Sequence, residues 1–188
     1  MNRVMIIGSG GAGKSTLAKK IETITKLPLV HLDQYFWLPG WKERPTDEWR
    51  SLQETLCAEP RWIIDGNYGG TMDLRLAAAD TIIFLDANRW LCLYRVLLRT
   101  IKHLGRARPD MPKDCPERFT YQFLSYIFNY PRTRRLKILN TLESLPDTKE
   151  VLVLKSKVDI SNYLASLDKA QSENSTRNHP PDQSVFPP

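Results

Sequence analysis

The glycine-rich segment from Gly8 to Thr16 constrains this chain more than any other feature. It reads Gly-Ser-Gly-Gly-Ala-Gly-Lys-Ser-Thr, follows the apolar run Val4–Ile7 and precedes an amphipathic stretch over 17–24. A glycine, four residues and then Gly-Lys-Ser/Thr is the pattern of a loop whose backbone amides surround phosphate groups. Glycine adopts the positive φ angles that such a loop needs. The following helix adds unpaired N–H groups and a positive dipole end. The segment therefore predicts a nucleoside triphosphate site.

The motif, of the Walker A type, also predicts which of its side chains do the chemistry. We expect Lys14 to reach the β- and γ-phosphates and the Ser15 hydroxyl to ligate Mg²⁺. A chance glycine-rich turn is the alternative, but it does not account for the Lys-Ser pair between a strand pattern and a helix pattern. The expected cofactors are ATP and Mg²⁺. The predicted cofactor-binding residues are Gly8, Gly10, Gly11, Ala12, Gly13, Lys14, Ser15 and Thr16.

Composition narrows the class of protein. A chain of 188 residues suits one domain. It has no apolar run of bilayer length and no signal-peptide pattern, so we expect a cytoplasmic protein without a membrane partner. Three widely spaced cysteines, Cys57, Cys92 and Cys115, fit neither a zinc pattern nor a disulfide framework and are expected to be reduced thiols.

The net charge of +6 has two interpretations. A basic chain can have nucleic acid as its partner. However, the arginines concentrate between positions 89 and 135, where a lid that handles phosphate would also need them. No helix-turn-helix or zinc-finger pattern is present. The sequence therefore favours ATP and a small-molecule acceptor as partners over nucleic acid.

Five β-prone runs, over 3–7, 28–33, 61–65, 81–86 and 150–154, alternate with helical patterns and predict an α/β fold with a parallel sheet. Residues 1–167 are expected to form one domain. Within it, about 34–60 would bind the acceptor and about 105–131 would be the lid. Ser, Asn, Gln and Pro dominate 168–188, which predicts a disordered tail.

Carboxylates follow three of the predicted strands, at the sheet edge where ligands bind in such folds. Asp65 is the best Walker-B-type residue and is predicted to hold Mg²⁺ or its waters. Asp33 is predicted to meet the substrate or Mg²⁺-bound water, and the alternative is a helix cap or turn. Asp86 precedes a long helix, which favours a structural role. His31 is interpreted as a packed strand histidine.

Residues after the third strand are predicted to touch the acceptor. Gly66 would allow close approach to the backbone, and Asn67 and Tyr68 offer hydrogen-bonding groups. Arg75 would either grip an acceptor anion or form a surface pair with Asp73 or Asp80.

The segment over 34–45 is rich in aromatic residues, Pro and Gly and is predicted to be an ordered loop without helix or strand. Its rings would either form a wall for a ring-bearing acceptor or pack under the next helix, which Thr46 would cap.

The predicted helix over 89–104 has an apolar stripe and a basic stripe. We expect the apolar stripe, Leu91, Tyr94, Leu97 or Leu98, and Ile101, to pack inward. The basic stripe leads into a hinge-like segment, 105–112, in which Arg106 and Arg108 are predicted to stabilise charge on the transferred phosphoryl group. Further helices are predicted from 115 to 128 and, after an interruption at Pro131, to about Leu145.

These segments together resemble a known family. Their order resembles that of nucleotide and small-metabolite kinases of the adenylate kinase and shikimate kinase type. Asp65-Gly66-Asn67-Tyr68 resembles the Asp-Gly-Phe-Pro-Arg turn of adenylate kinases, but it lacks the Pro and the adjacent Arg, which weakens the case for AMP as acceptor.

More narrowly, the chain resembles the bacterial topology modulation protein family, which is related to adenylate kinases. The resemblance covers most of residues 1–165. It implies a three-layer P-loop NTPase fold with strand order 2-3-1-4-5 and a helical lid. The segments that carry it are Val4–Thr16, His31–Asp33, Phe36–Trp41, Arg61–Tyr68, Asp73–Leu76, Arg89–Leu93 and Gly105–Met111.

The leading hypothesis is an ATP-dependent phosphotransferase that acts on a small acceptor. Lys14, Arg106 and Arg108 would stabilise the moving phosphoryl group, and Ser15 and Asp65 would hold Mg²⁺. Asp33 would orient the acceptor or act as its base. The alternatives are a nucleotide-binding regulator associated with DNA topology and an acceptor-independent NTPase.

Overall fold

The strand that precedes the phosphate loop lies in the middle of the sheet. The structure, a computed structural model, describes residues 1–177, and its five-stranded sheet is parallel throughout. The order is β2-β5-β1-β6-β7, which is the predicted order 2-3-1-4-5, so the predicted fold class is confirmed. The strands are β1 (Arg3–Gly8), β2 (Leu29–His31), β5 (Trp62–Asp65), β6 (Thr81–Leu85) and β7 (Glu150–Leu154).

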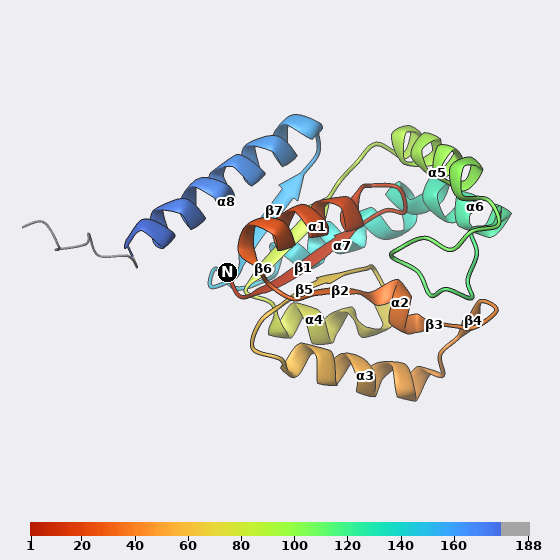
Figure 1. The fold of residues 1–188 in the computed structure, drawn as a ribbon, viewed down its shortest axis with the longest axis horizontal. Helices are drawn as coiled ribbons and strands as arrows, with labels where there is room; N and C mark the ends of the chain where they lie inside the picture. Colours follow the sequence, from red (N-terminus) through yellow and green to blue (C-terminus); the bar gives the residue numbers. More distant parts are fainter. Residues whose placement is uncertain (178–188) are drawn as a thin grey trace, which may run out of the picture.

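Helices cover both faces of the sheet, and alternate residues of the central strand pack into two separate hydrophobic cores, one on each face. Val4 and Ile6 pack with α1 (Lys14–Thr25) and α8 (Lys157–Arg177). Met5 and Ile7 pack with α3 (Thr46–Ala58), α4 (Met72–Ala78) and α7 (Leu136–Glu143). Figure 1 shows α1 and α8 on one side of the strands and α3 and α4 on the other. A parallel sheet buried on both faces gives the three layers that the sequence predicted.

The register brings the carboxyl ends of the inner strands to one edge. Ile6 of β1 lies beside Asp65 of β5, and His31 of β2 lies beside the same Asp65. The phosphate loop leaves β1 at Gly8, which lies beside Leu85 of β6. The loop and the carboxylates at the strand ends therefore share one edge of the sheet.

The aromatic segment is not the irregular loop that we predicted. It forms α2 (Leu32–Phe36) and a two-stranded hairpin, β3 (Trp37–Leu38) and β4 (Lys42–Glu43). Gly40 and Trp41 have positive φ angles of 75° and 64° and make the hairpin turn. The Pro39-Gly40 pair correctly indicated a turn. The two strands were missed because two residues are too few to show an alternation of apolar and polar side chains.

The helices after the lid also differ from the prediction. α6 (Tyr121–Tyr130) begins six residues later than expected, because Glu117 pairs through its backbone with Gly105 and Arg106 and holds the preceding segment extended. Pro131 does not interrupt the helix. It opens a π-helical turn, η2 (Pro131–Arg135), that continues into α7. A wider turn accommodates a residue that has no N–H to donate.

Two helix ends lie elsewhere than expected. α3 begins at Thr46 with Pro45 in the capping position, so the predicted Thr46 cap is wrong by one residue. α8 continues to Arg177, although the tail was predicted to be disordered from 168. Helix-forming Lys, Ala, Gln and Glu within 169–173 extend it. The remainder of the predicted tail, 178–188, lies outside the described residues.

The long helix α5 (Arg89–His103) occurs where predicted but packs through a different face. Cys92, Val96 and Thr100 are buried, whereas Tyr94 and Ile101 of the predicted apolar stripe are 60% and 74% exposed. The inward face carries small side chains because the helix lies close to the phosphate loop, as described below. Each helix within residues 1–177 is too short or too polar to span a bilayer.

Candidate active site at the carboxyl edge of the sheet

The phosphate loop connects β1 to α1 and has the backbone that its glycines predicted. Gly8, Gly11 and Gly13 have φ angles of 148°, 78° and 105°. A Cβ at Gly11 would lie 2.4 Å from the Cys92 carbonyl oxygen of α5, and one at Gly8 would lie 2.6 Å from the Leu85 carbonyl oxygen. These two glycines are therefore required by both conformation and space. The first N–H groups of α1 have no acceptor within the helix and can serve an anion.

Lys14 lies inside the loop that precedes it. Its Nζ donates hydrogen bonds to the carbonyl oxygens of Gly8 at 3.0 Å and Ser9 at 3.1 Å. Burial lowers the pKa of Lys14, although the charges of Asp65 and Asp33 act in the opposite direction. The ammonium group is thus held by short contacts at the mouth of the loop, where a phosphate would meet it.

A cavity of about 890 Å³ opens from the loop. Its phosphate end is lined by Gly10, Gly11, Gly13, Lys14, Ser15 and Thr16, together with Arg95 of α5. Its other end, which we call the hairpin end, is lined by Asp33, Trp37, Trp41, Glu43, Gly66, Tyr68, Asp110 and Arg118. The cavity as a whole is also lined by Asp65, Asn67, Arg99, Arg108 and Glu117. The structure therefore brings most of the predicted site residues into one space. Gly8 and Ala12, which were predicted to bind the cofactor, are buried and do not line the cavity.

Asp33 enters the cavity from the first turn of α2, two residues after β2 ends. Tyr68 Oη donates a hydrogen bond of 2.5 Å to Asp33 Oδ1. Burial raises the pKa of Asp33, while the Tyr68 hydrogen bond and the charge of Lys14 oppose the rise. Burial and the neighbouring Asp33 carboxylate raise the pKa of Tyr68, which keeps its hydroxyl protonated. A partly buried carboxylate with increased proton affinity has the properties of a general base.

Asp65 has a partner that the sequence did not reveal. His31 Nδ1 lies 2.8 Å from Asp65 Oδ2, and both side chains are buried. Burial alone would lower the pKa of His31, but the hydrogen bond and charge of Asp65 outweigh it, so the net pKa is raised. His31 is packed at the strand end, as interpreted from sequence, and it also orients the predicted Mg²⁺ residue.

The protein groups near Asp65 suit a metal ion that takes some of its ligands from the protein and others from a bound phosphate. No cluster of three or more His, Cys, Asp or Glu side chains suited to a metal occurs within residues 1–177. Mg²⁺ commonly keeps several waters and binds one or two protein oxygens plus substrate phosphates. Ser15 and Asp65, which both line the cavity, match that need.

Asn67 ties the phosphate loop to two other elements. Its Oδ1 accepts a 2.9 Å hydrogen bond from the Gly8 N–H, and its Nδ2 donates a 2.8 Å hydrogen bond to Tyr126 Oη of α6. Asn67 was predicted to bind the acceptor. Although it lines the cavity, its amide is already engaged, so we assign it to positioning the phosphate loop.

Arg75 does not reach the cavity, so its predicted role in substrate binding is wrong. Its side chain is fully buried and donates to the backbone carbonyls of Gly66 at 2.6 Å, Asn67 at 2.8 Å and Tyr68 at 2.9 Å. The alternative surface pair is wrong as well, because Asp73 pairs with Arg50. Burial lowers the pKa of Arg75 to about 10. Arg75 supports, from behind, the turn that carries Tyr68.

The lid provides one of the two predicted arginines. Arg108 lines the cavity and pairs with Asp110 at 3.1 Å and Glu117 at 2.6 Å. Arg106 is exposed and lies outside the cavity, so this structure does not place it among the catalytic groups. The role of Arg106 was predicted from a local cluster of arginines. Such a cluster does not indicate which of its side chains face the cavity.

Several charged residues that line the cavity were not predicted, among them Arg95, Arg99 and Glu117. Arg95 and Arg99 of α5 line the cavity, although their stripe was expected only to lead into the lid. Their spacing of four residues on an amphipathic helix was the available signal. Glu117 is 6% exposed, pairs with Arg99 at 3.3 Å and accepts a hydrogen bond from Thr100 Oγ1 at 3.0 Å. Nothing local in the sequence marks Glu117.

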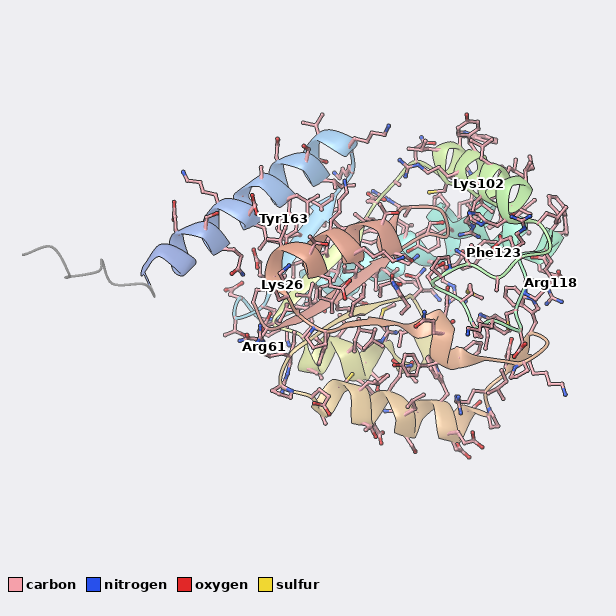
Figure 2. The ribbon with its side chains drawn as sticks, in the orientation of Figure 1. Lys26, Arg61, Lys102, Arg118, Phe123 and Tyr163 are labelled. Atoms are coloured by element: carbon pink, nitrogen blue, oxygen red, sulfur yellow. The ribbon has the colours of Figure 1, made fainter. Side chains whose placement is uncertain are left out.

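The segment predicted to be a lid, 105–131, contacts the hairpin. The Gly40 N–H donates to the Asp114 carbonyl at 3.2 Å, and Trp41 Nε1 donates to the Pro116 carbonyl at 3.1 Å. Arg118, labelled with Phe123 at the lid side of Figure 2, lies over the Trp41 ring at 4.9 Å.

The rings of the aromatic segment divide between the cavity and the packing under α3. Trp37 and Trp41 line the cavity, whereas Phe36 packs against Trp49 and Tyr68 at 5.1 and 4.7 Å. The sequence left these uses open, and the structure divides the rings between them.

Comparison with known proteins shows the fold. No protein-family model and no curated protein matches the chain. Among solved structures, it is similar to a shikimate kinase from Bacteroides thetaiotaomicron, with 16% identity and a TM-score of 0.55 over 91% of this chain and 98% of that one. It is also similar to a shikimate kinase from Acinetobacter baumannii in complex with shikimate, with 13% identity and a TM-score of 0.52 over 93% and 94% of the two chains.

Proposed function

We propose that this protein is an ATP-dependent phosphotransferase that acts on a small acceptor. One observation carries the proposal: one cavity is lined both by the phosphate loop and by a partly buried carboxylate, Asp33, and the arginines Arg95, Arg99 and Arg108 line it as well. A volume of about 890 Å³ has room for a nucleotide and a second small molecule. The shared fold supports the proposal, because the two similar structures are named shikimate kinases.

The phosphate end would hold Mg-ATP. The loop amides and Lys14 would contact the phosphates, and Ser15 with Asp65 would hold the metal directly or through water. Bound Mg²⁺ would neutralise charge on the β- and γ-phosphates. The hydrogen bond from His31 keeps the Asp65 carboxylate oriented for this task.

The transfer itself needs positioning and charge stabilisation rather than a covalent nucleophile. An acceptor oxygen beside Asp33 would bond to the γ-phosphorus while the bond from that phosphorus to the β–γ bridging oxygen breaks. Asp33 would take the proton of a hydroxyl acceptor. Lys14 would contact the moving group and stabilise its charge, and Arg99 and Arg108 would add their positive charge nearby while they stay paired with Glu117 and Asp110. The proposed lid, about 105–131, would exclude water, and the hairpin within about 34–60 would contact the acceptor.

We also propose that the chain is related to the topology modulation protein family and that the protein is located in the cytoplasm. A DNA-associated regulator is the less favoured function, because several arginines that suggested nucleic acid have other partners. Arg99 and Arg108 pair with Glu117, and Arg135 makes two 2.7 Å hydrogen bonds to Asp86.

A phosphotransfer screen tests the proposal. Wild type, Lys14→Ala and the control Lys20→Ala, an exposed lysine on the same helix, would be incubated with Mg-ATP and a panel of hydroxylated metabolites, nucleosides and nucleotides while ADP is measured. We expect acceptor-dependent ADP that is lost only in Lys14→Ala. ADP formation that ignores every acceptor would instead indicate an NTPase. ATP binding without turnover would favour the regulator, and salt-sensitive DNA binding would then be measured.

A further inference from the structure

The hairpin end of the cavity is rich in carboxylates. Asp33 from α2, Glu43 from β4, and Asp110 and Glu117 from the lid all line the cavity. They come from segments far apart in the sequence, and the lid contacts with the hairpin bring them together. Glu117 is buried and Asp33 is partly buried, so their negative charge is costly to leave beside another anion.

The arginines near these carboxylates are already engaged. Arg108 pairs with Asp110 and Glu117, and Arg99 pairs with Glu117. Arg118 lies over the Trp41 ring. Asp33, Glu43, Asp110 and Glu117 thus share the cavity with Arg99, Arg108 and Arg118, each of which already has a partner. An anionic acceptor would have to displace a carboxylate from its arginine, whereas an uncharged acceptor would not.

The remaining surface suits a ring. Trp37 and Trp41 line the same end with their centroids 5.2 Å apart and their planes inclined by 67°. Trp41 is held by its hydrogen bond to Pro116. The parts of these two indoles that line the cavity offer apolar surface against which a small ring can pack, while surrounding carboxylates accept hydrogen bonds from its hydroxyls.

We infer that the acceptor is an uncharged, ring-containing molecule with several hydroxyl groups, as in a monosaccharide or a nucleoside. This inference rests on the proposed phosphotransferase function and adds the acceptor class to it. One hydroxyl lies at Asp33. Its oxygen bonds to the γ-phosphorus, the bond to the β–γ bridging oxygen breaks, its proton passes to Asp33, and ADP leaves. The other hydroxyls donate to Glu43 and Asp110.

Matched acceptor pairs test the inference. In each pair the ring is kept and only an anionic group differs: glucose with glucuronate, ribose with ribose 5-phosphate, adenosine with AMP, and methyl shikimate with shikimate. Binding to wild type would be followed by calorimetry with Mg²⁺ and a non-hydrolysable ATP analogue, and kcat/KM by ADP formation with ATP. We expect each responding pair to favour its uncharged member by at least about tenfold. The sugar and nucleoside pairs distinguish the two sources of such a ring.

The two measurements separate this inference from the proposed function. Turnover that favours the anionic members would support a kinase and overturn the inference. Binding of uncharged members without phosphotransfer would support the inferred ligand class and count against the kinase. Binding by none of the uncharged members would overturn the inference, even if ATP binds.

A charge reversal at the cavity rim gives a second, independent measurement. Glu43→Lys should lower kcat/KM for the preferred uncharged acceptor about fivefold and raise the relative value for its anionic partner by a similar factor. Glu48→Lys, on the exposed surface of α3, makes the same change in net charge outside the cavity and should alter neither value. If the two variants had equal effects, the cause would be the change in net charge acting at long range. That result would overturn the role of Glu43.

Discussion

The phosphate end and the hairpin end of the cavity are assembled in different ways. The groups of the phosphate end come mainly from nine consecutive residues, 8–16, which lie between the central strand and a helix packed on it. The hairpin end takes its groups from α2, the hairpin, the turn after β5 and the lid. The first is fixed by the local chain and the core, whereas the second depends on contacts between loops.

This difference bears on what each end can do. Gly8 and Gly11 have no space for a side chain, so the phosphate loop can change little. The hairpin end is closed by hydrogen bonds such as Gly40 to Asp114 and Trp41 to Pro116, which can open without disturbing the sheet. We therefore expect substitutions at the phosphate end to affect the reaction with any acceptor, and those at the hairpin end to affect which acceptor reacts.

The largest effect is expected at Lys14. Lys14→Ala removes the ammonium group that Gly8 and Ser9 hold at the loop mouth. Activity with every acceptor should fall about 10³-fold, as when a preorganised charge-stabilising donor is lost. Thermal unfolding should stay close to wild type. Full turnover in this variant would show that the phosphate end does not work as proposed.

Asp33→Asn tests the hydroxyl side of the reaction. Loss of the base should lower kcat by about 10² with a hydroxyl acceptor, while nucleotide binding, measured by calorimetry, stays unchanged. Wild-type kcat should fall on the acid side at a pH above the ordinary carboxyl range, because burial raises the pKa of Asp33. An unchanged kcat in the variant would remove Asp33 from the chemistry.

Asp33→Asn is expected to increase the stability of the fold, although it lowers activity. A raised pKa means that the folded protein binds the Asp33 proton more tightly than the unfolded chain does. The free energy of unfolding therefore falls as the pH rises from the ordinary value of 3.8 through the raised value. Asp33→Asn lacks this loss and should be more stable than wild type at neutral pH, with the difference disappearing below the ordinary value. Urea unfolding across pH measures it.

The contrast between the two ends also explains what the sequence could predict. The phosphate loop, Lys14 and the alternation of strands with helices follow from patterns that are local or that repeat along the chain, whereas the strand order was implied by the resemblance to a known family. Asp33 and Asp65 were found because each closes a predicted strand. Arg99 and Glu117 meet only after the lid folds back on α5, and no local pattern encodes their contact.

Arg75 illustrates the same limit from the other side. Its position after the Gly66–Tyr68 turn suggested an anion site, but sequence cannot tell a guanidinium in front of a turn from one behind it. Arg75→Met should leave one buried and two partly buried carbonyls without their donor and lower the free energy of unfolding by about 3 kcal/mol. Arg50→Met, at an exposed arginine, should not shift the urea midpoint. Unchanged stability with a raised KM for the acceptor would restore the original interpretation of Arg75.

The smallest effect is expected at Tyr68, where the turn supported by Arg75 meets the base. Tyr68→Phe keeps the ring packed against Phe36 and Trp49 but removes the hydrogen bond to Asp33. The loss of one such bond should lower kcat/KM for the acceptor about tenfold and leave ATP binding unchanged. Because that hydrogen bond holds the pKa of Asp33 down, the acid limb of the pH profile should move to higher pH in the variant. Tyr35→Phe, a tyrosine outside the cavity lining, is the control. A drop in activity without the shift in the acid limb would mean that Tyr68 contacts the acceptor itself and does not act through Asp33.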